Sequence, residues 1–307
     1  MSSINGYASA LVAASAAAST QHYPKGALYV VATPIGNLAD ISLRALHVLD
    51  LVETAACEDT RHSQTLLRAY GIHKNASQLL AVHQHNEIEA SRTVIDRLQL
   101  GQRIAYMSDA GTPGVSDPGA RLVAAVRAAG LQVIPMPGAS SITTLLSAAG
   151  VSVDGTDAQG FLFAGFIPGR AGEREAFVKA LTSESRCVVV LEAPHRISVA
   201  AVALSALGPR RITVGRELTK QFEEIATLAA HDFPAWLAAS PSRTRGEFAL
   251  AIHPADSQLV PVTDLRVLRL LLAELPLKTA VRLAAEITGE PKNDLYDAAL
   301  SLRDSAQ

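Results

Sequence analysis

The sequence has little of what marks disulfide-rich, metal-binding or membrane proteins. It contains two cysteines in 307 residues, Cys57 and Cys187, which are far apart and lack the paired spacing of a metal site. We expect both to be reduced core residues, as in proteins of the reducing cytoplasm. No apolar run reaches the roughly 18 residues of a membrane span. We therefore predict a cytoplasmic protein with no membrane segment and no metal.

Aromatic residues and excess charge are also scarce. Aromatic residues make up 5% of the chain and hydrophobic residues 49%, so the core must consist mainly of Ala, Val, Leu and Ile. This content is sufficient for two domains of ordinary size. The net charge is -2, so the overall charge does not attract nucleic acid. Any RNA contact would depend on local basic patches.

The N-terminal stretch Tyr7–Thr20 is rich in Ala and Ser, as a signal peptide can be. However, no Lys or Arg precedes it, so the positively charged region of a signal peptide is missing. We expect residues 1–25 to form a mobile extension.

From Gly26 onward, short apolar strands alternate with amphipathic helices, which predicts an α/β fold with a mainly parallel sheet over residues 26–138. The predicted strands are Ala27–Thr33, Thr54–Glu58, Gln78–His83, Arg103–Ser108 and Gln132–Pro137. The predicted helices are Ser42–Leu51, Asn86 to about Leu100, and Asp117–Ala129. Asn86 and Glu89 have the spacing of a capping box at the start of the second of these helices.

A second α/β domain is predicted over residues 139–255, after a helix at Ala139–Ala149 and a polar hinge at 151–160. Several of its strands follow one another without a long helix, which indicates a mixed sheet. Beyond the linker at 254–261, residues 262–305 form a helical appendix. Its last two helices, Leu277–Thr288 and Asn293–Arg303, have helix-turn-helix spacing. A packing or dimer-contact role for this appendix is as plausible as RNA binding.

Two Gly- and Pro-containing segments follow predicted strands, where open α/β folds bind ligands. The first is TPIGNL at 33–38, which is neither a GxGxxG dinucleotide motif nor a phosphate-binding loop of NTPases. The second, Ser108–Gly119, contains three Gly, two Pro and two Asp in twelve residues. Such a loop is stiff and exposes the backbone groups that an adenosyl moiety and an amino acid tail need. Asp109 can accept from a ligand, whereas Asp117 is as readily a helix cap.

Polar clusters follow other predicted strands. Glu58, Asp59, Arg61 and His62 come after the second strand, where they could orient a ribose hydroxyl and hold a phosphate, or cap a helix. PGASS at 137–141 is a strand-to-helix turn in which Ser140 or Ser141 could cap the helix or contact a ligand. LEAPHR at 191–196 and ELTK at 217–220 are weaker signals of the same kind.

Taken in order, these motifs resemble the ribosomal RNA small subunit methyltransferase I family of the tetrapyrrole methylase-like (class III) methyltransferases. The similar segments lie at 33–42, 55–63, 108–119, 137–150, 191–197, 216–220, 245–252 and 275–300. The resemblance implies two α/β domains with S-adenosylmethionine in the cleft between them, usually in a homodimer. It also implies that the acceptor is the 2′-hydroxyl of a cytidine in the decoding region of 16S rRNA, as free RNA or in the assembled small subunit.

The resemblance places the cofactor contacts on one set of residues: Pro34, Ser108, Asp109, Ala110, Gly111, Thr112, Pro113, Gly114, Ser140 and Leu191. We assign RNA contacts to Asn37, His62, His195, Arg196, Lys220, Lys278 and Lys292. The appendix has about as many acids as bases, so RNA docking there requires Lys278, Arg282 and Lys292 on one face.

Methyl transfer from a sulfonium mainly requires in-line positioning of the acceptor oxygen. We hypothesise that Glu58 or Asp59 accepts the proton or orients the hydroxyl, while Arg61 holds a phosphate. Two alternatives remain: a C-methyltransferase acting on a tetrapyrrole, and a non-catalytic module that only binds S-adenosylmethionine.

Overall fold

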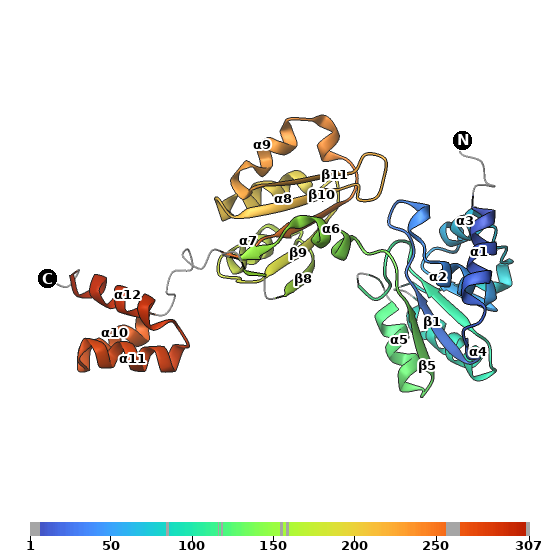
Figure 1. Cartoon of the computed structure of the whole chain (residues 1–307), viewed down its shortest axis with the longest axis horizontal. Coiled ribbons are helices and arrows are strands. Elements are labelled where there is room, and N and C mark those ends of the chain that lie inside the picture. Colours follow the sequence, from blue (N-terminus) through green and yellow to red (C-terminus); the bar gives the residue numbers. More distant parts are fainter. Residues whose placement is uncertain are drawn as a thin grey trace.

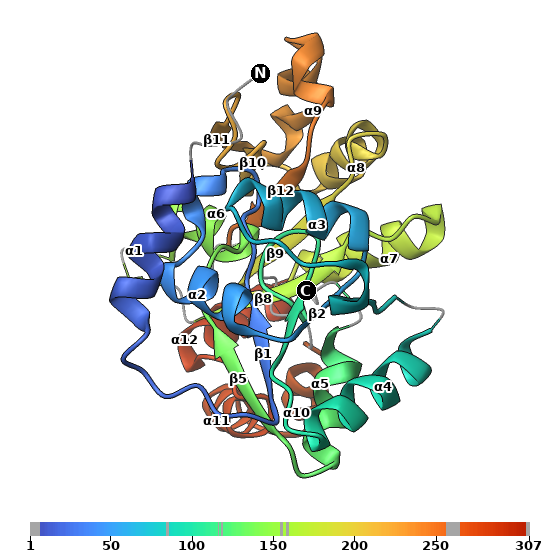
Figure 2. The same cartoon turned by 90° about the vertical axis from the view of Figure 1, so that its right-hand side faces the viewer.

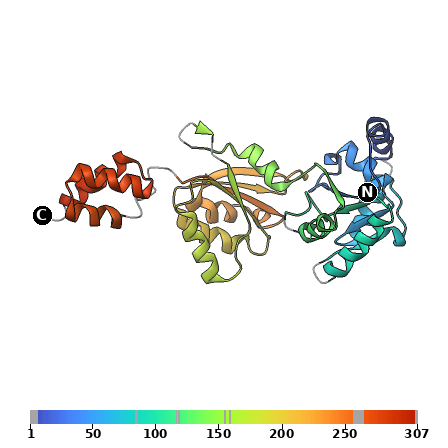
Figure 3. The same cartoon turned by 90° about the horizontal axis from the view of Figure 1, so that it is seen from below.

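The computed structural model describes residues 7–83, 86–115, 117, 119–153, 156–157, 160–255 and 265–304. Figure 1 shows an N-terminal sheet with its helices, then a second sheet with its helices, and then a separate group of helices near the C-terminus. Figure 3 shows the same three parts in a row. None of the described helices is long and apolar enough to cross a membrane.

The first sheet is wholly parallel, as predicted, with strand order β3-β2-β4-β1-β5. Its strands are β1 (Ala27–Val31), β2 (Thr54–Cys57), β3 (Leu79–Ala81), β4 (Ile104–Met107) and β5 (Gln132–Met136). The predicted strands are confirmed, with ends that differ by one or two residues. The central strands are apolar on both sides because helices cover both faces of the sheet.

Four helices make those two layers: α2 (Leu43–Leu51), α3 (Thr60–Ala69), α4 (Glu87–Gln99) and α5 (Gly119–Ala128). Leu46 and Leu49 of α2 pack with Leu67 of α3 on one face. Val94 of α4 packs with Leu122 of α5 on the other face. Figure 2 shows α1 and α2 apart from α4 and α5, with the strands between them.

The N-terminal segment differs from the mobile extension that we expected. Residues Ala8–Ala18 form helix α1, which packs against α2. Ala14 and Ala18 are buried, and the Tyr23 hydroxyl donates to the Ala18 carbonyl oxygen at 3.1 Å. Small side chains let the two helices approach closely, so an Ala-rich sequence can bury a face without large residues. The prediction is therefore wrong for residues 7–25.

The predicted capping box at α4 is also wrong. The Asn86 side chain makes no capping bond to the helix. Its Oδ1 instead accepts from the His83 amide at 2.9 Å, and its Nδ2 donates to the Ala81 carbonyl oxygen at 3.0 Å. Asn86 therefore ties the end of β3 to the helix start.

The second sheet is mixed, as predicted, in the order β11-β10-β12-β9-β8. Only the β8–β9 pair is parallel among its pairings. Its strands are β8 (Phe161–Phe166), β9 (Cys187–Glu192), β10 (Arg211–Arg216), β11 (Glu224–Ala229) and β12 (Phe248–Ile252). The predicted hinge contains two short paired strands, β6 (Ser152–Val153) and β7 (Thr156–Asp157).

Helices cover both faces of this sheet too. One face carries α7 (Ala171–Leu181), α8 (Ile197–Leu204) and α9 (Phe233–Ala238). The other carries α6 (Ser141–Ala149), whose Leu145 packs with Val189 and Ala251. Cys57 and Cys187 are both free and buried in the cores, as predicted.

The C-terminal helices are α10 (Leu265–Glu274), α11 (Leu277–Thr288) and α12 (Lys292–Asp304). They share a small core of their own that contains Leu268, Ala284 and Leu295. The predicted helices agree with these within one residue at most ends. Residues 256–264, which include most of the predicted linker, lie outside the described part of the chain.

Candidate functional site

A cleft lies where strand ends of the two sheets face each other. One cavity of about 250 Å³ is lined by the Ser108–Thr112 loop, by Glu58 and Ser140, and by Leu191 and Glu247 of the second domain. An adjoining cavity of about 340 Å³ is lined mainly by second-domain residues, including Phe166 and Leu218. Both cavities share Ile35, Ser141, Leu191 and Glu247, so they form one continuous cleft.

The Gly- and Pro-rich loop after β4 is held against the end of β1. Thr33 and Gly111 exchange two backbone hydrogen bonds, at 2.9 and 3.1 Å. The Ser108 hydroxyl donates to the Gly111 carbonyl oxygen at 3.2 Å, and the Thr112 hydroxyl donates to the Ala139 carbonyl oxygen at 2.9 Å. Gly111 has a φ of 84°, which only Gly adopts readily. The polar side chains of Ser108 and Thr112 thus shape the loop.

Asp117 organises the second half of this loop. Its carboxylate accepts from the Gly114 amide at 2.6 Å, the Gly119 amide at 2.8 Å and the Tyr106 hydroxyl at 3.0 Å. The bond to Gly119, the first residue of α5, agrees with the interpretation of Asp117 as a cap. The hydroxyl of Tyr106, a buried residue of β4, thereby anchors the loop to the sheet.

Glu58 is half-buried in the cleft wall, beside two other carboxylates. Burial and the nearby charges of Asp109 and Asp117 raise the pKa of Glu58, and a hydrogen bond from the Asp109 amide opposes this rise. Asp109 also accepts from the Asp59 amide at 3.3 Å, which joins the ends of β2 and β4. A carboxylate with a raised pKa in a cleft is a suitable proton acceptor.

Asp59, Arg61 and His62 begin helix α3. Asp59 caps this helix, accepting from the Arg61 and His62 amides at 2.8 and 3.4 Å, and these bonds lower the pKa of its carboxyl. The Arg61 side chain is 92% exposed and lies 3.5 Å from Asp59. His62 is exposed. Of this cluster, Glu58 lines the cavity, whereas the other three are not among its lining residues.

Four other residues from the first half of the chain were predicted to contact the cofactor or RNA. Pro34 and Pro113 are both buried. Asn37 is exposed, and its side chain accepts from the Ala39 amide at 3.0 Å at the start of a short 3-10 helix. Ser140 precedes α6 but makes no capping bond, and it lines the cavity.

In the second domain, Arg196 forms an ion pair with a buried carboxylate. Its Nε lies 3.0 Å from Glu192, whose side chain is 1% exposed, and its guanidinium also donates to the Ile167 carbonyl oxygen. Lys220 contacts Glu217 at 2.9 Å and Glu247 at 3.1 Å. His195 is exposed. The charges of Arg196 and Lys220 are therefore already balanced by carboxylates.

In the C-terminal helices, Lys278, Arg282 and Lys292 are all exposed. Lys278 and Arg282 are four residues apart on α11 and so lie on the same side of it. Arg282 pairs with Glu286 at 3.1 Å. Lys292 begins α12.

The sequence interpretation did not assign Ile35, Leu218 and Glu247 to the cleft, although each lies in a motif that it singled out at a strand end. Ser141, which also lines the cleft, was one of the two serines considered for a ligand contact. Nothing in the sequence says that the two sheets meet there, so local patterns could not bring these residues to one cleft. Among the described residues, no group of three or more His, Cys, Asp or Glu could hold a metal ion.

Comparison with known proteins decides the family. The family model "Tetrapyrrole (Corrin/Porphyrin) Methylases" matches residues 27–232, and the model "RsmI C-terminal HTH domain" matches residues 260–303. Proteins named ribosomal RNA small subunit methyltransferase I are similar over nearly their whole length. The one from Pseudomonas aeruginosa is 46% identical over 90% of this chain and 97% of its own. The chain belongs to the ribosomal RNA small subunit methyltransferase I family.

Other members are nearly as similar; the Escherichia coli O157:H7 relative is 44% identical over 90% of this chain and 95% of its own. Solved structures share the family's fold at low sequence identity. Diphthine synthase matches with a TM-score of 0.56 and 13% identity, covering 76% of this chain and 92% of its own. A uroporphyrin-III C-methyltransferase from Thermus thermophilus matches with a TM-score of 0.53 and 19% identity, covering 77% and 96%.

Proposed function

We propose that the protein transfers a methyl group from S-adenosylmethionine to the ribose 2′-hydroxyl of a cytidine in the decoding region of 16S rRNA. The observation that carries this proposal is the continuous cleft, whose lining includes Ser108–Thr112 of the loop and Leu191 of the second domain. Family membership supports rRNA of the small subunit as substrate, since the relatives bear that name. We also propose a cytoplasmic homodimer, acting on free rRNA or on the assembled subunit.

The cleft residues fit S-adenosylmethionine. The loop offers backbone amides and carbonyls beside Asp109, which suit the polar amino acid tail, while Ile35 and Leu191 give apolar walls for a purine. A Cβ at Gly111 would lie 3.3 Å from Ile35 Cγ2 and narrow this space. When bound, the cofactor supplies a methyl group already activated by its sulfonium. The residues proposed to hold the cofactor are the Ser108–Gly114 loop, Leu191, Pro34 and Ser140.

Glu58 is the proposed proton acceptor. Methyl transfer would form an O–CH₃ bond and break the S–CH₃ bond of the donor, whose electron pair stays on sulfur, while the Glu58 carboxylate would take up the hydroxyl proton. Its raised pKa makes it a better base than an ordinary surface carboxylate. Asp59 holds the start of α3, and the exposed Arg61 there is free to reach a phosphate when it leaves its weak pair with Asp59. We assign Asp59 a positioning role.

The target ribose must be reached by unstacking its nucleotide, because sequence-specific RNA recognition uses splayed bases. Asn37, His62 and His195 are exposed and are proposed to contact the RNA around the cleft. Arg196 and Lys220 would contact it only by exchanging a carboxylate partner. Lys278 and Lys292 are the proposed contacts of the helical appendix.

The test uses purified protein, labelled S-adenosylmethionine and two acceptors, small ribosomal subunits from cells without this protein and uroporphyrinogen. We expect label in 16S rRNA at a single ribose, found by reverse transcription at low nucleotide concentration. Label in the tetrapyrrole would favour the C-methyltransferase alternative. Cofactor binding by calorimetry without label in either acceptor would favour the binding-only alternative. Sedimentation of the same preparation tests the dimer.

A further inference from the structure

Phe222 is an exposed aromatic side chain in a turn next to strand ends that line the cleft. It lies in the turn between β10 and β11 and is 69% exposed. This turn lies at the end of the sheet where β9 ends and β12 begins, because Arg216 pairs with Phe248 and Phe248 pairs with Glu192. The second cavity of the cleft opens at this edge, because Glu192 and Phe248 line it. The Phe222 side chain is more exposed than those of Phe161 and Phe166, which are 48% and 51% exposed.

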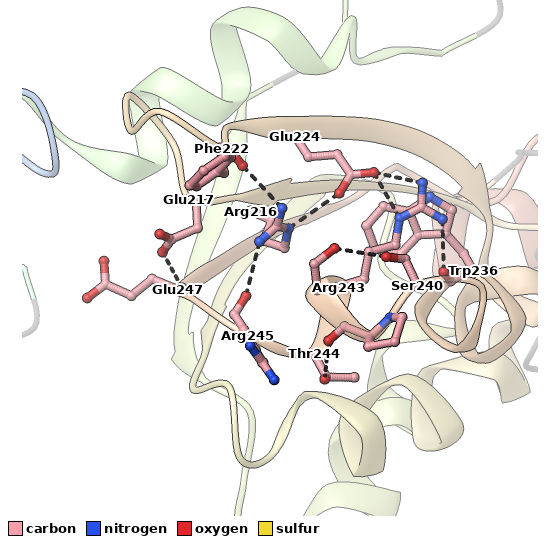
Figure 4. A network of polar contacts seen from close by, with 12 residues as sticks. Arg216, Glu217, Phe222, Glu224, Trp236, Ser240, Arg243, Thr244, Arg245 and Glu247 are labelled. Carbon is pink, nitrogen blue, oxygen red and sulfur yellow. Dashed lines mark hydrogen bonds and ion pairs between the residues drawn. The ribbon is translucent and has the colours of Figure 1, made fainter.

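A buried arginine holds the backbone under this turn. Arg216, 7% exposed, donates to the Phe222 carbonyl oxygen at 3.2 Å and to the Arg245 carbonyl oxygen at 3.3 Å. It also pairs with Glu224 at 3.3 Å. Figure 4 shows Phe222 and Arg245 on opposite sides of Arg216, each joined to it by a dashed line. One guanidinium therefore fixes the two turns relative to each other.

The network is anchored further by a second arginine. Arg243 contacts the other Glu224 oxygen at 2.7 Å and stacks over the Trp236 ring at 4.2 Å. It donates to the Trp236 carbonyl oxygen at 3.0 Å, which ties the network to α9 (Figure 4). Paired arginines sharing one carboxylate, with a cation–π contact, make a stiff support.

The other charged side chains around this support already have hydrogen-bond or ion-pair partners. Glu217 and Glu247 hold Lys220, Glu224 holds the two arginines, and Glu223 accepts from the Thr219 amide at 2.6 Å. Arg245 is exposed, and its side chain makes no hydrogen bond or ion pair within the described part of the chain. The support thus presents one exposed guanidinium and one exposed aromatic ring, each a few residues along the chain from Glu247 or Leu218, which line the cleft.

We propose that Phe222 and Arg245 form a nucleotide-docking platform, on which Phe222 stacks an unpaired base next to the methylated nucleotide and Arg245 contacts its phosphate. Aromatic stacking and guanidinium–phosphate contact are the two ways in which proteins hold single-stranded RNA. The inference rests on the proposed function, because it takes the RNA to be the acceptor. It adds a strand-holding site outside the cofactor cleft.

The experiment measures KM and kcat for small subunits, together with the calorimetric Kd for S-adenosylmethionine. We expect F222A to raise KM about tenfold, as loss of one stacked base does, with the cofactor Kd unchanged, and F222W to keep KM near the wild-type value. The Kd for rRNA is also measured at several salt concentrations. For R245Q, the slope of log Kd against log salt should be less steep than that of the wild type by about 0.7, the value for one lost phosphate contact on a single strand.

Matched controls are F161A, which removes a similarly exposed phenylalanine of β8, and R127A, which removes an exposed arginine at the far end of α5. Both should leave KM and the salt slope unchanged. A wild-type KM in F222A would overturn the proposed platform. A change in sedimentation alone would also overturn it, because Phe222 would then be a contact between protein chains. If the wild-type protein itself leaves 16S rRNA unmethylated, the proposed function fails instead.

Discussion

Gly36 and Lys220 meet between the two α/β domains. A Cβ at Gly36 would overlap Lys220 Cγ and lie 3.1 Å from the Leu218 carbonyl oxygen. The turn that carries Lys220 is itself unusual, since Glu217 and Thr219 have φ values of 51° and 67°. Such residues keep this conformation only where their surroundings hold them. The close approach of the two turns therefore sets how the two walls of the cleft face each other.

A G36A substitution should disturb this approach. The added methyl has to displace the backbone at Leu218 as well as a flexible lysine, so the two walls separate. We expect the Kd for S-adenosylmethionine to rise about tenfold or more, measured by calorimetry. Gly172 is the matched control, because a Cβ there meets nothing within 4 Å. G172A should bind the cofactor like the wild-type protein, and equal affinities for both variants would contradict this role of Gly36.

An E58Q substitution tests the proton acceptor. We expect kcat to fall about 10²-fold while the cofactor Kd stays nearly constant. The pKa of Glu58 is raised, so its carboxylate form is lost as the pH falls through that raised value. The wild-type kcat should therefore decline toward acid pH, and the E58Q variant should lack this decline. An unchanged turnover in E58Q would remove Glu58 from the mechanism.

Asp59 can be separated from Glu58 by two substitutions. Asp59 accepts the Arg61 and His62 amides at the start of α3. Asn caps helices as well as Asp, whereas Ala does not. We expect D59N to unfold at nearly the wild-type urea concentration with a similar kcat, and D59A to unfold at a lower one. A large loss of kcat in D59N would instead make the Asp59 charge part of the chemistry.

A Y106F substitution tests how the cofactor loop is held. The Tyr106 hydroxyl donates to Asp117, which in turn accepts the Gly114 amide. Without the Tyr106 hydroxyl, the loop loses its hydrogen bond to β4. We expect the Kd for S-adenosylmethionine to rise several-fold, with a melting temperature close to that of the wild type. Y29F is a useful comparison, since Tyr29 donates to Pro24 away from the cleft, and it should bind the cofactor normally.

His253 should make the stability of the second domain depend on pH. It is 2% exposed and hydrogen-bonded to Thr213 at 2.8 Å, and burial together with Arg211 and Arg210 lowers its pKa to about 4. The unfolded chain binds this proton near pH 6.5, so folding stability is complete above that pH and declines as the pH falls toward 4. The loss amounts to roughly 3 kcal/mol.

Urea unfolding at a series of pH values measures this loss. The other histidines also titrate, so the H253Q variant supplies their contribution. We expect the wild-type free energy of unfolding to fall more steeply between pH 6.5 and 4 than that of H253Q. Parallel curves would show that His253 does not carry the effect.

Much of the site was predictable because it lies at strand ends. Buried apolar strands followed by Gly, Pro and Asp mark the carboxyl edge of a parallel sheet, and Glu58 and Ser108–Thr112, singled out in this way, line one cavity. The role of Asp59 was left between chemistry and capping, and the structure shows the cap. Sequence spacing could not decide this, since both roles need the same carboxylate at the same position.

The sequence by itself determined the two α/β domains, the parallel and mixed sheets, the helix Leu277–Thr288 and the family, because these depend on local periodicity and on ordered motifs. Only the tertiary structure decided that α1 is packed, that Asn86 does not cap α4, and that Lys220 is held by Glu217 and Glu247. It also placed the carbonyl oxygens of Phe222 and Arg245 within hydrogen-bond distance of the Arg216 guanidinium. Such partners are far apart in the chain, and their pairing depends on strand order and on how two sheets meet, which no local pattern encodes.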